Sequence, residues 1–436
     1  MAEPGTKRAF VALGAGLLAL LVGWRMCSRD DRSGHGTSTT TAGTESSTAR
    51  PSPGAAGLGV PIAAAHAGSG EVIVAGLDVG ARAIRVQRIG ANDHVLADEI
   101  ALDDATSAAD PDLKLVAHPK EGVAVTWRGM RGGKLVRQLA VLGPDLERRG
   151  EPTEVAAASC ATRDAVWFSD GSHAIARPWS GGSSTIELPK DKDASLLCTS
   201  SRAFAVLDEE DGTSILVLGS DGGRAVTVVR DRELGEDEQR ELSEYTVGDD
   251  VGFVRLGSSG AIAVRELSAG TLGPLRRLET SLPKDDDVVA VDASPKVLAI
   301  VYTEDVSSAC PAGDDTASSK VRVLRVDRTT LEESTLELSA GKCGVEVGPF
   351  FTGVLGDAVS VAWTERTGGA GRARAPITGL AHATIARSGT PSLARIDQEA
   401  DALVDAGCDG RTCYAVALVR GKGPEAPGVA KVLRYE

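Results

Sequence analysis

From Glu71 to the C-terminus, short apolar runs alternate with turn-forming residues. The runs are rich in Val, Ile, Leu and Ala, and the turns contain Asp-Gly, Gly-Gly and Ser-Gly pairs. This alternation predicts β-strands joined by tight turns, and no stretch keeps a sustained helical period. The charge-dense run Glu233–Glu244 has few apolar residues and is predicted to be an inserted loop or a short exposed helix. The sequence therefore predicts an all-β protein.

One phrase recurs within this pattern: a charged or glycine-containing turn, an apolar strand and a polar turn. Its copies are spaced by roughly 40 to 60 residues, the range typical of propeller blades. Several copies are followed by a second alternating strand, as at Ser214–Leu218, and by a third, as at Thr335–Leu338. The copies are Gly122–Trp127, Asp164–Phe168, Arg202–Leu207, Val251–Leu256, Val297–Tyr302, Ala358–Trp363 and Tyr414–Leu418.

This order, a buried inner strand followed by more polar outer strands, resembles a β-propeller spanning residues 70–436. The copies of the phrase indicate seven blades, with Glu71–Leu102 as an alternative eighth unit or as closing strands. We expect strands from both ends of the chain to combine in one blade and close the ring. A string of β-sandwich domains is the competing fold. Because the Trp-Asp, kelch and Asp-box signatures are absent, the resemblance implies an architecture and no particular activity.

The N-terminal segment, residues 1–32, has the pattern of an export signal. Lys7 and Arg8 precede the apolar run Ala9–Trp24, which is a little short for a spanning helix of about 20 residues. We expect an uncleaved membrane anchor, with the main domain periplasmic or extracellular. Acylation of Cys27 in a lipoprotein, or a cleaved signal and secretion, are the alternatives.

Residues 33–69 are rich in Ser, Thr, Gly, Pro and Ala. Such a composition cannot bury enough apolar surface to offset the entropy lost on ordering. We therefore expect a flexible linker between the anchor and the propeller. From about Ala56 to Ser69 the Ala- and Gly-rich residues are either part of this linker or the entry to the fold.

Composition and charge argue against some binding partners. Aromatic residues make up only 3% of the chain, which leaves little for sugar- or base-stacking platforms. The net charge of −14 also disfavours nucleic acid, which normally meets a basic surface.

Six cysteines lie in the predicted propeller, and an even number in an exported chain indicates disulfides. Sequence proximity favours three pairs, although fifteen pairings are open. Neither a CxxC nor an HxxxH pair occurs, so no metal or cofactor is predicted. The favoured pairs are Cys160 with Cys198, Cys310 with Cys343, and Cys408 with Cys413.

Acidic turns are the most visible polar features. Asp208–Gly212 has oxygen ligands suited to calcium, but its spacing does not match an EF-hand and an Asp-Gly hairpin turn, which we favour, accounts for it without metal. Asp285–Asp287 is predicted to be a solvated connection. Cys310–Lys320 is predicted to be a disulfide-pinned loop, either inert or projecting for recognition.

Ser169–His173 contains the residue types of a hydrolytic triad, but one turn cannot arrange them in the required relay. Gly257–Gly260 lacks the strand–helix context of a nucleophile elbow. Gly368–Gly371, with Arg372 and Arg374, lacks the setting of a phosphate cradle and indicates a mildly basic loop.

Four tryptophans of the predicted propeller could line a binding cleft or pack in the core. Trp127, Trp167 and Trp363 belong to the apolar phrases, so we expect them to be core residues. Trp179 follows Pro178 in a turn-like setting and is predicted to be the most exposed.

Three functions remain open. The first is an extracytoplasmic interaction or scaffolding protein, tethered to the membrane and binding a protein partner on a propeller face. The second is a hydrolase or lyase with a site at the central channel, assembled from several blades. The third is a calcium- or small-ligand-binding sensor. No catalytic residue is identified, and the sequence favours a non-enzymatic role.

Overall fold

The structure is a computed structural model of the 436-residue chain. The anchor and most of the predicted linker lie outside the residues that it describes. These are residues 59–68, 71–78, 83–90, 95–102, 113–118, 120–131, 133–155, 160–189, 194–209, 212–218, 225–230, 239–268, 270–283, 286–310, 318–367, 377–386, 389, 391–396, 400–409, 412–419 and 429–435.

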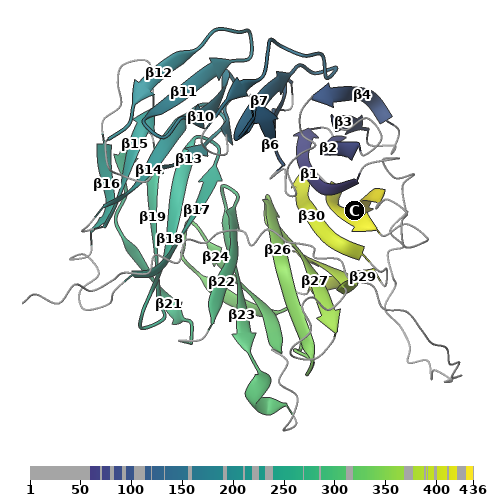
Figure 1. The fold of residues 1–436 in the computed structure, drawn as a ribbon. Helices are drawn as coiled ribbons and strands as arrows, with labels where there is room; N and C mark the ends of the chain where they lie inside the picture. Colours follow the sequence, from purple (N-terminus) through teal and green to yellow (C-terminus); the bar gives the residue numbers. More distant parts are fainter. Residues whose placement is uncertain are drawn as a thin grey trace, which may run out of the picture.

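The described strands form a ring of antiparallel sheets, each built from consecutive strands of the chain (Figure 1). Six sheets are single blades, and a seventh sheet contains two blades that are linked by one bridge, Ile377 to Ala400. The fold is therefore a β-propeller with eight blades.

The first four blades occupy the N-terminal half of the described chain. Blade 1 contains β1 (Gly59–Gly68), β2 (Glu71–Asp78), β3 (Ala83–Ile89) and β4 (Val95–Leu102). Blade 2 contains β5 (Lys114–His118), β6 (Gly122–Arg131), β7 (Lys134–Leu142) and β8 (Thr153–Glu154). Blade 3 contains β9 (Cys160–Ala161), β10 (Ala165–Ser169), β11 (His173–Pro178) and β12 (Ser184–Glu187). Blade 4 contains β13 (Ala194–Cys198), β14 (Ala203–Glu209), β15 (Gly212–Leu218) and β16 (Ala225–Arg230).

The other four blades complete the ring. Blade 5 contains β17 (Gln239–Val247), β18 (Asp250–Gly257), β19 (Ala261–Ser268), and β20 (Thr271–Leu272) and β21 (Arg276–Ser281), which both pair with β19. Blade 6 contains β22 (Asp287–Ala293), β23 (Val297–Asp305), β24 (Ser319–Asp327) and β25 (Glu333–Glu337), with the 3-10 helix η3 (Ser307–Ala309) after β23. Blade 7 contains β26 (Val345–Leu355), β27 (Ala358–Thr367), β28 (Ile377–Ile385) and β29 (Pro391–Ile396). Blade 8 contains β30 (Ala400–Asp409), β31 (Thr412–Val419) and β32 (Val429–Tyr435).

The seven copies of the recurring apolar phrase are the second strands of blades 2 to 8, and the prediction that the phrase is the inner strand is wrong. The first strands contact one another around the middle of the ring, as β22 contacts β26 and β26 contacts β30 (Figure 1). A second strand has a bonded strand on both edges and a neighbouring blade on both faces. It is therefore the most buried, as β10 is along its whole length, whereas first strand β5 is only half-buried.

The blade count is eight instead of the predicted seven. The unit Glu71–Leu102, predicted as an alternative eighth, supplies β2, β3 and β4 of blade 1. The remaining strand β1, Gly59–Gly68, lies at the end of the segment 33–69, where both a linker and the entry to the fold were open, so the propeller begins before residue 70. Ala and Gly dominate β1, and these residues are depleted from strands, so its composition resembled a linker.

The described part of the charged run Glu233–Glu244, from Gln239 onward, is a strand, and residues 233–238 lie outside the described ranges. The described part enters β17, the first strand of blade 5, which pairs with β18. A first strand packs less tightly than the second, so its apolar signal is weak.

The two ends of the chain do not share a blade among the described strands, which corrects the predicted closure. Blade 1 and blade 8 are separate sheets. Side chains close the ring instead, in a buried cluster that combines blade 1 with blade 8. We call this cluster the seam; it contains Val72, Val74, Ile89, Tyr414, Val416 and Val432.

Two disulfides cross between neighbouring blades. Cys160 on β9 bonds to Cys198 on β13, and Cys310 after η3 bonds to Cys343 before β26. These are two of the pairs that sequence proximity favoured. Because disulfides persist in oxidising environments, they indicate an extracytoplasmic compartment. Within the described ranges, no helix has the length and apolarity needed to span a bilayer.

Candidate functional site

A solvent-open cleft lies between blades 5 and 6. Its walls come from β19, β20 and the start of β21 on one side, and from β23 and the β24–β25 turn on the other. We call it the inter-blade cleft, and the end of the ring on which it opens the cleft face. It is lined by Val264, Glu266, Ser268, Thr271, Gly273, Pro274, Arg276, Leu298, Val326, Arg328 and Leu331.

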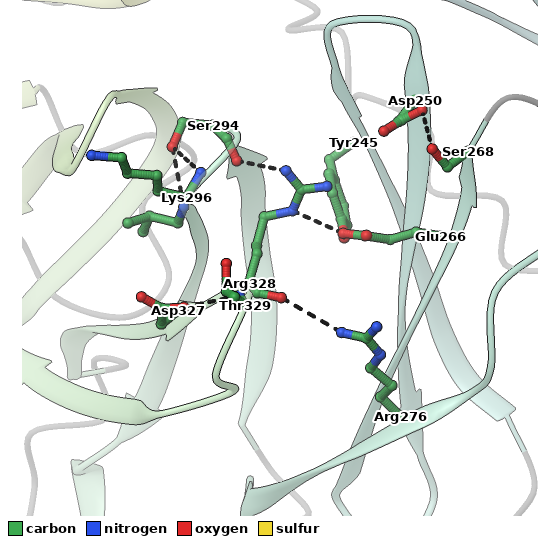
Figure 2. Close-up of polar contacts among 11 residues, drawn as sticks. Tyr245, Asp250, Glu266, Ser268, Arg276, Ser294, Lys296, Asp327, Arg328 and Thr329 are labelled. Atoms are coloured by element: carbon green, nitrogen blue, oxygen red, sulfur yellow. Dashed lines mark hydrogen bonds and ion pairs between the residues drawn. The ribbon is translucent and has the colours of Figure 1, made fainter.

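A charged network joins the two walls of the cleft (Figure 2). The Glu266 Oε1 atom accepts a hydrogen bond from the Tyr245 hydroxyl at 2.6 Å and from Arg328 Nε at 2.9 Å. Arg328 Nη1 also donates to the carbonyl of Ser294 at 2.9 Å, in the turn between β22 and β23. Arg328 is therefore held by both blades, and its ion pair with Glu266 crosses the blade boundary.

The network shifts the pKa values of its members in directions that keep it intact. Burial alone would raise the pKa of Glu266, but the hydrogen bonds from Arg328 and Tyr245 hold it below its usual value. Burial and the adjacent Glu266 carboxylate raise the pKa of Tyr245. Glu266 is thus ionised and Tyr245 neutral at ordinary pH, so the Tyr245 hydroxyl remains a donor.

Leu331 lines the cleft from an unusual backbone position. Its φ of 61° is in the left-handed region, where glycine is the default residue. A hydrogen bond from its backbone N–H to the carbonyl of Asp327, at 2.8 Å, closes the turn. A leucine here costs on the order of 1 kcal/mol relative to glycine, so its side chain must contribute packing or binding in return.

Arg276 lies at the start of β21, on the same side of the cleft as Glu266, and is exposed. Its Nη1 atom lies 3.5 Å from the carbonyl of Arg328, a long contact (Figure 2). Among the described residues, no ion pair joins Arg276 to a carboxylate. Arg276 is close enough to Glu266 to help lower the pKa of that carboxyl group, but without an ion pair its guanidinium can still bind a ligand.

The cleft combines an apolar floor with polar walls. Val264, Leu298 and Val326 are buried and belong to the core cluster between blades 5 and 6. The volume of about 160 Å³ is well below the roughly 300–1,000 Å³ of sites for drug-sized ligands. Such a cleft suits one side chain of a partner better than a free metabolite.

The cleft face is tied together by contacts between the turns that follow the first strands. Ser200 and Ser201 of blade 4 both donate to Asp249 of blade 5, at 2.9 and 2.6 Å. In blade 6, Ser294 Oγ donates to the carbonyl of Gly356 in blade 7 at 2.5 Å. These contacts make a firm frame around the cleft.

The triad-like residues of Ser169–His173 form a turn, as the sequence predicts. Asp170 Oδ1 accepts from the backbone N–H of Ser172 at 2.9 Å and of His173 at 2.8 Å. The Ser172 hydroxyl and the Asp170 carboxylate both contact the same ring atom, His173 Nδ1, at 3.0 and 3.1 Å. A catalytic relay uses the two ring nitrogens separately, so this arrangement cannot perform it.

The acidic segments are placed in two different environments. Asp208 and Glu209 pair with Thr213 and Gly212 in the β14–β15 hairpin, and Glu210 and Asp211 lie outside the described residues. In the segment Asp285–Asp287, Asp286 is only 3% exposed, which corrects the prediction of a solvated connection at that residue, whereas Asp287 is exposed as predicted and Asp285 lies outside the described residues. Among the described residues, no group of three His, Cys, Asp or Glu side chains could hold a metal ion.

The remaining candidate residues are distributed around the ring. Gly257–Gly260 forms the turn between β18 and β19. Residues 311–317 of the disulfide-pinned loop, and the glycine- and arginine-rich loop 368–374, lie outside the described residues. Cys408 and Cys413 face each other in the β30–β31 ladder, and their disulfide stays a prediction.

The tryptophans are buried, including the one predicted to be exposed. Trp127 and Trp363 have no exposed surface, and Trp167 is 9% exposed. Trp179 is 3% exposed because its Nε1 atom donates to the carbonyl of Thr162 at 3.1 Å and its ring packs between blades 2 and 3.

The sequence did not point to the inter-blade cleft. Glu266 and Arg328 are 62 residues apart in different blades, and each occupies an ordinary-looking strand end or turn. Only the alignment of neighbouring blades brings them together. The one local signal was Leu331, an apolar residue in a polar turn.

The fold and the cleft define the class: an eight-bladed β-propeller with a charged inter-blade cleft. Neither a family model nor a curated protein matches the sequence. Among solved structures, the chain is similar to the WD40 domain of SCAP from fission yeast, at 7% identity and a TM-score of 0.48, over 88% of this chain and 96% of that one.

Two other solved structures show a weaker likeness. The quinohemoprotein alcohol dehydrogenase from Comamonas testosteroni is 9% identical with a TM-score of 0.45, over 84% of this chain and 72% of that one. The Nup133 β-propeller domain from Vanderwaltozyma polyspora is 9% identical with a TM-score of 0.35, over 68% and 89%. The assignment of the fold rests on the strand pairing of this chain itself.

Proposed function

We propose that this protein is an extracytoplasmic interaction module that holds a protein partner at its cleft face. The observation that carries the proposal is the inter-blade cleft, in which an apolar floor adjoins a pre-formed charged network. Aromatic and arginine anchors, or apolar side chains seated in such a pocket, supply most of the affinity of a protein interface. A rigid ring presents the cleft with little ordering cost on binding.

The enzyme alternative has weaker support. Asp292 on the first strand β22 has a pKa raised by burial to about 6, as a general acid would need. Its hydrogen-bond partners, however, are backbone groups, among them the N–H of Val354 at 2.8 Å. A single carboxyl without a second acid–base group gives no complete catalytic set.

We infer that the N-terminal segment tethers the module to the membrane. The apolar run Ala9–Trp24 after Lys7 and Arg8 supports an anchor, and the polar composition of residues 33–58 supports a spacer. The two disulfides are consistent with a propeller outside the cytoplasm. A tethered full-length chain would remain with membranes after an alkaline wash, and release into the supernatant would contradict the tether.

Site-specific photo-crosslinking in intact membranes tests the partner. We place p-benzoylphenylalanine at Thr271, an exposed residue of the cleft wall, and in a control chain at Leu393, which is 52% exposed on the outer strand β29. A discrete adduct from the Thr271 chain, absent from the Leu393 chain, is the expected result. No adduct at Thr271, or the same adducts at both positions, would overturn the proposal.

A further inference from the structure

The inter-blade cleft is small and open to solvent. Its volume of about 160 Å³ suits a single side chain better than a drug-sized ligand. The last residue of a polypeptide can place its side chain in such a cleft with its own terminal carboxylate beside it.

The floor of the cleft selects the type of side chain. Val264, Leu298 and Val326 form the floor, and Leu331 packs beside them from the β24–β25 turn. Each of these is aliphatic, so an aliphatic side chain would exclude water from the floor without leaving a polar group unpaired.

The charged side chains of the cleft walls determine which ligand charge the cleft favours. The guanidinium of Arg328 is neutralised by Glu266, and its Nε and Nη1 atoms already donate to protein acceptors. Arg276 has one long contact to a carbonyl and faces the same cleft (Figure 2). Arginine binds a carboxylate with two parallel hydrogen bonds, so Arg276 favours a carboxylate at the mouth.

An aliphatic side chain beside a carboxylate is the chemistry of a polypeptide that ends in Leu, Ile or Val. We propose that the inter-blade cleft binds the C-terminal aliphatic residue of a partner protein, with its α-carboxylate on Arg276. This inference rests on the proposed function and specifies which part of the partner is recognised.

Binding of short peptides to the full-length protein in detergent tests the inference. The probe is a fluorescein-labelled Gly-Ser-Gly-Ser-Leu with a free C-terminal carboxylate, compared with the same peptide as its C-terminal amide. Fluorescence anisotropy should show about tenfold weaker binding for the amide, because the charge-assisted pair with Arg276 is lost. Equal affinities for acid and amide, or no measurable binding of the acid, would overturn the inference.

Variants at two neighbouring arginines test whether Arg276 binds the C-terminal carboxylate of the peptide. Arg276→Glu should weaken the free-acid peptide about tenfold or more and abolish the difference between acid and amide. Arg277→Glu is the control, since Arg277 is the exposed neighbour that alternation along β21 directs away from the cleft. It should bind within about twofold of the parent. Arg276→Gln replaces Arg276→Glu if circular dichroism shows that the latter is unfolded. Equal losses from positions 276 and 277 would contradict the assignment.

The two proposals can fail separately. If photo-crosslinking at Thr271 captures a partner while acid and amide peptides bind equally, the cleft binds a partner but not through a chain end. If neither experiment gives binding at the cleft, the proposed function itself fails.

Discussion

At the scale of single residues, the most consequential buried group is Asp292. It lies on β22 and accepts a hydrogen bond from the backbone N–H of Val354 on β26, at 2.8 Å. Burial raises its pKa from 3.8 to about 6. The folded state therefore prefers the neutral acid, which stabilises the fold at low pH, and this contribution is lost as the pH rises through 6.

Replacing Asp292 with Asn should remove that pH dependence. Relative to the parent, Asp292→Asn should gain up to about 3 kcal/mol of unfolding free energy between pH 4 and pH 7, since asparagine cannot ionise. Urea unfolding of both proteins at several pH values measures the difference.

Asp327→Asn is the matched control for this series. Backbone N–H groups of Thr330 and Thr329 lower the pKa of Asp327, the opposite direction to the shift at Asp292. Asp327→Asn should therefore gain no stability relative to the parent as the pH rises from 4 to 7. The same absence of a gain for Asp292→Asn would show that Asp292 does not titrate in the folded state near pH 6.

The burial of individual residues could be predicted from the sequence in some cases and not in others. The burial of Trp127 and Trp363 followed from their apolar strands, and the turn at Asp170 followed from its composition. Trp179 was mistaken for an exposed residue because its local setting, after Pro178, is a turn. Its burial depends on Thr162 and on blade 2, contacts that no local pattern encodes.

At the scale of strands and turns, two glycines with similar φ angles allow the cost of backbone strain to be distinguished from the cost of a steric clash. Gly260, with φ of 85°, ends the β18–β19 turn, and Gly270, with φ of 78°, lies in the β19–β20 turn. A Cβ atom at Gly260 would lie 1.8 Å from the carbonyl oxygen of Leu282, whereas a Cβ atom at Gly270 would meet nothing within 4 Å.

Alanine should therefore be far more damaging at position 260 than at position 270. Gly270→Ala should cost about 1–2 kcal/mol, the strain of an L-residue in the left-handed region. Gly260→Ala should cost at least about 3 kcal/mol, because the backbone of Leu282 must also move. Urea unfolding measures both, and equal costs would mean that the Leu282 contact is easily relieved.

The burial of each strand explains why the sequence predicted the second strands correctly but missed first strands and the arrangement of neighbouring blades. Second strands are buried on both faces, so each gives a continuous apolar run that is easy to recognise. First strands such as β1 and β17 are richer in small or charged residues, and they were assigned to a linker and a loop. The register between blades, which creates the inter-blade cleft, is not encoded in any single segment.

At the scale of the whole molecule, the seam differs from the other blade boundaries. Among the described strands, blades 1 and 8 are joined only through packed side chains. The other neighbouring blades are also joined by the chain itself, and two of these boundaries carry a disulfide. The seam depends on buried residues such as Val74, Val416 and Val432. We therefore expect local opening to begin there.

Hydrogen exchange of two matched core variants tests this expectation. Val416→Ala and Val323→Ala each remove a fully buried side chain, at the seam and between blades 6 and 7 respectively. Each should cost about 2 kcal/mol of unfolding free energy. Only Val416→Ala should speed amide exchange selectively in β2, β3, β31 and β32. Uniform acceleration around the ring in both variants would show that the propeller opens as one unit.

The seam has a consequence for how this chain could be rearranged. Because every blade is one uninterrupted stretch of polypeptide, a gene cut between any two blades and rejoined through the old ends would encode the same set of sheets in a different order. Duplication or loss of one stretch would likewise add or remove a complete blade. Such circularly permuted versions of the molecule should reach the same ring, since none of the described sheets needs a strand borrowed from the opposite end.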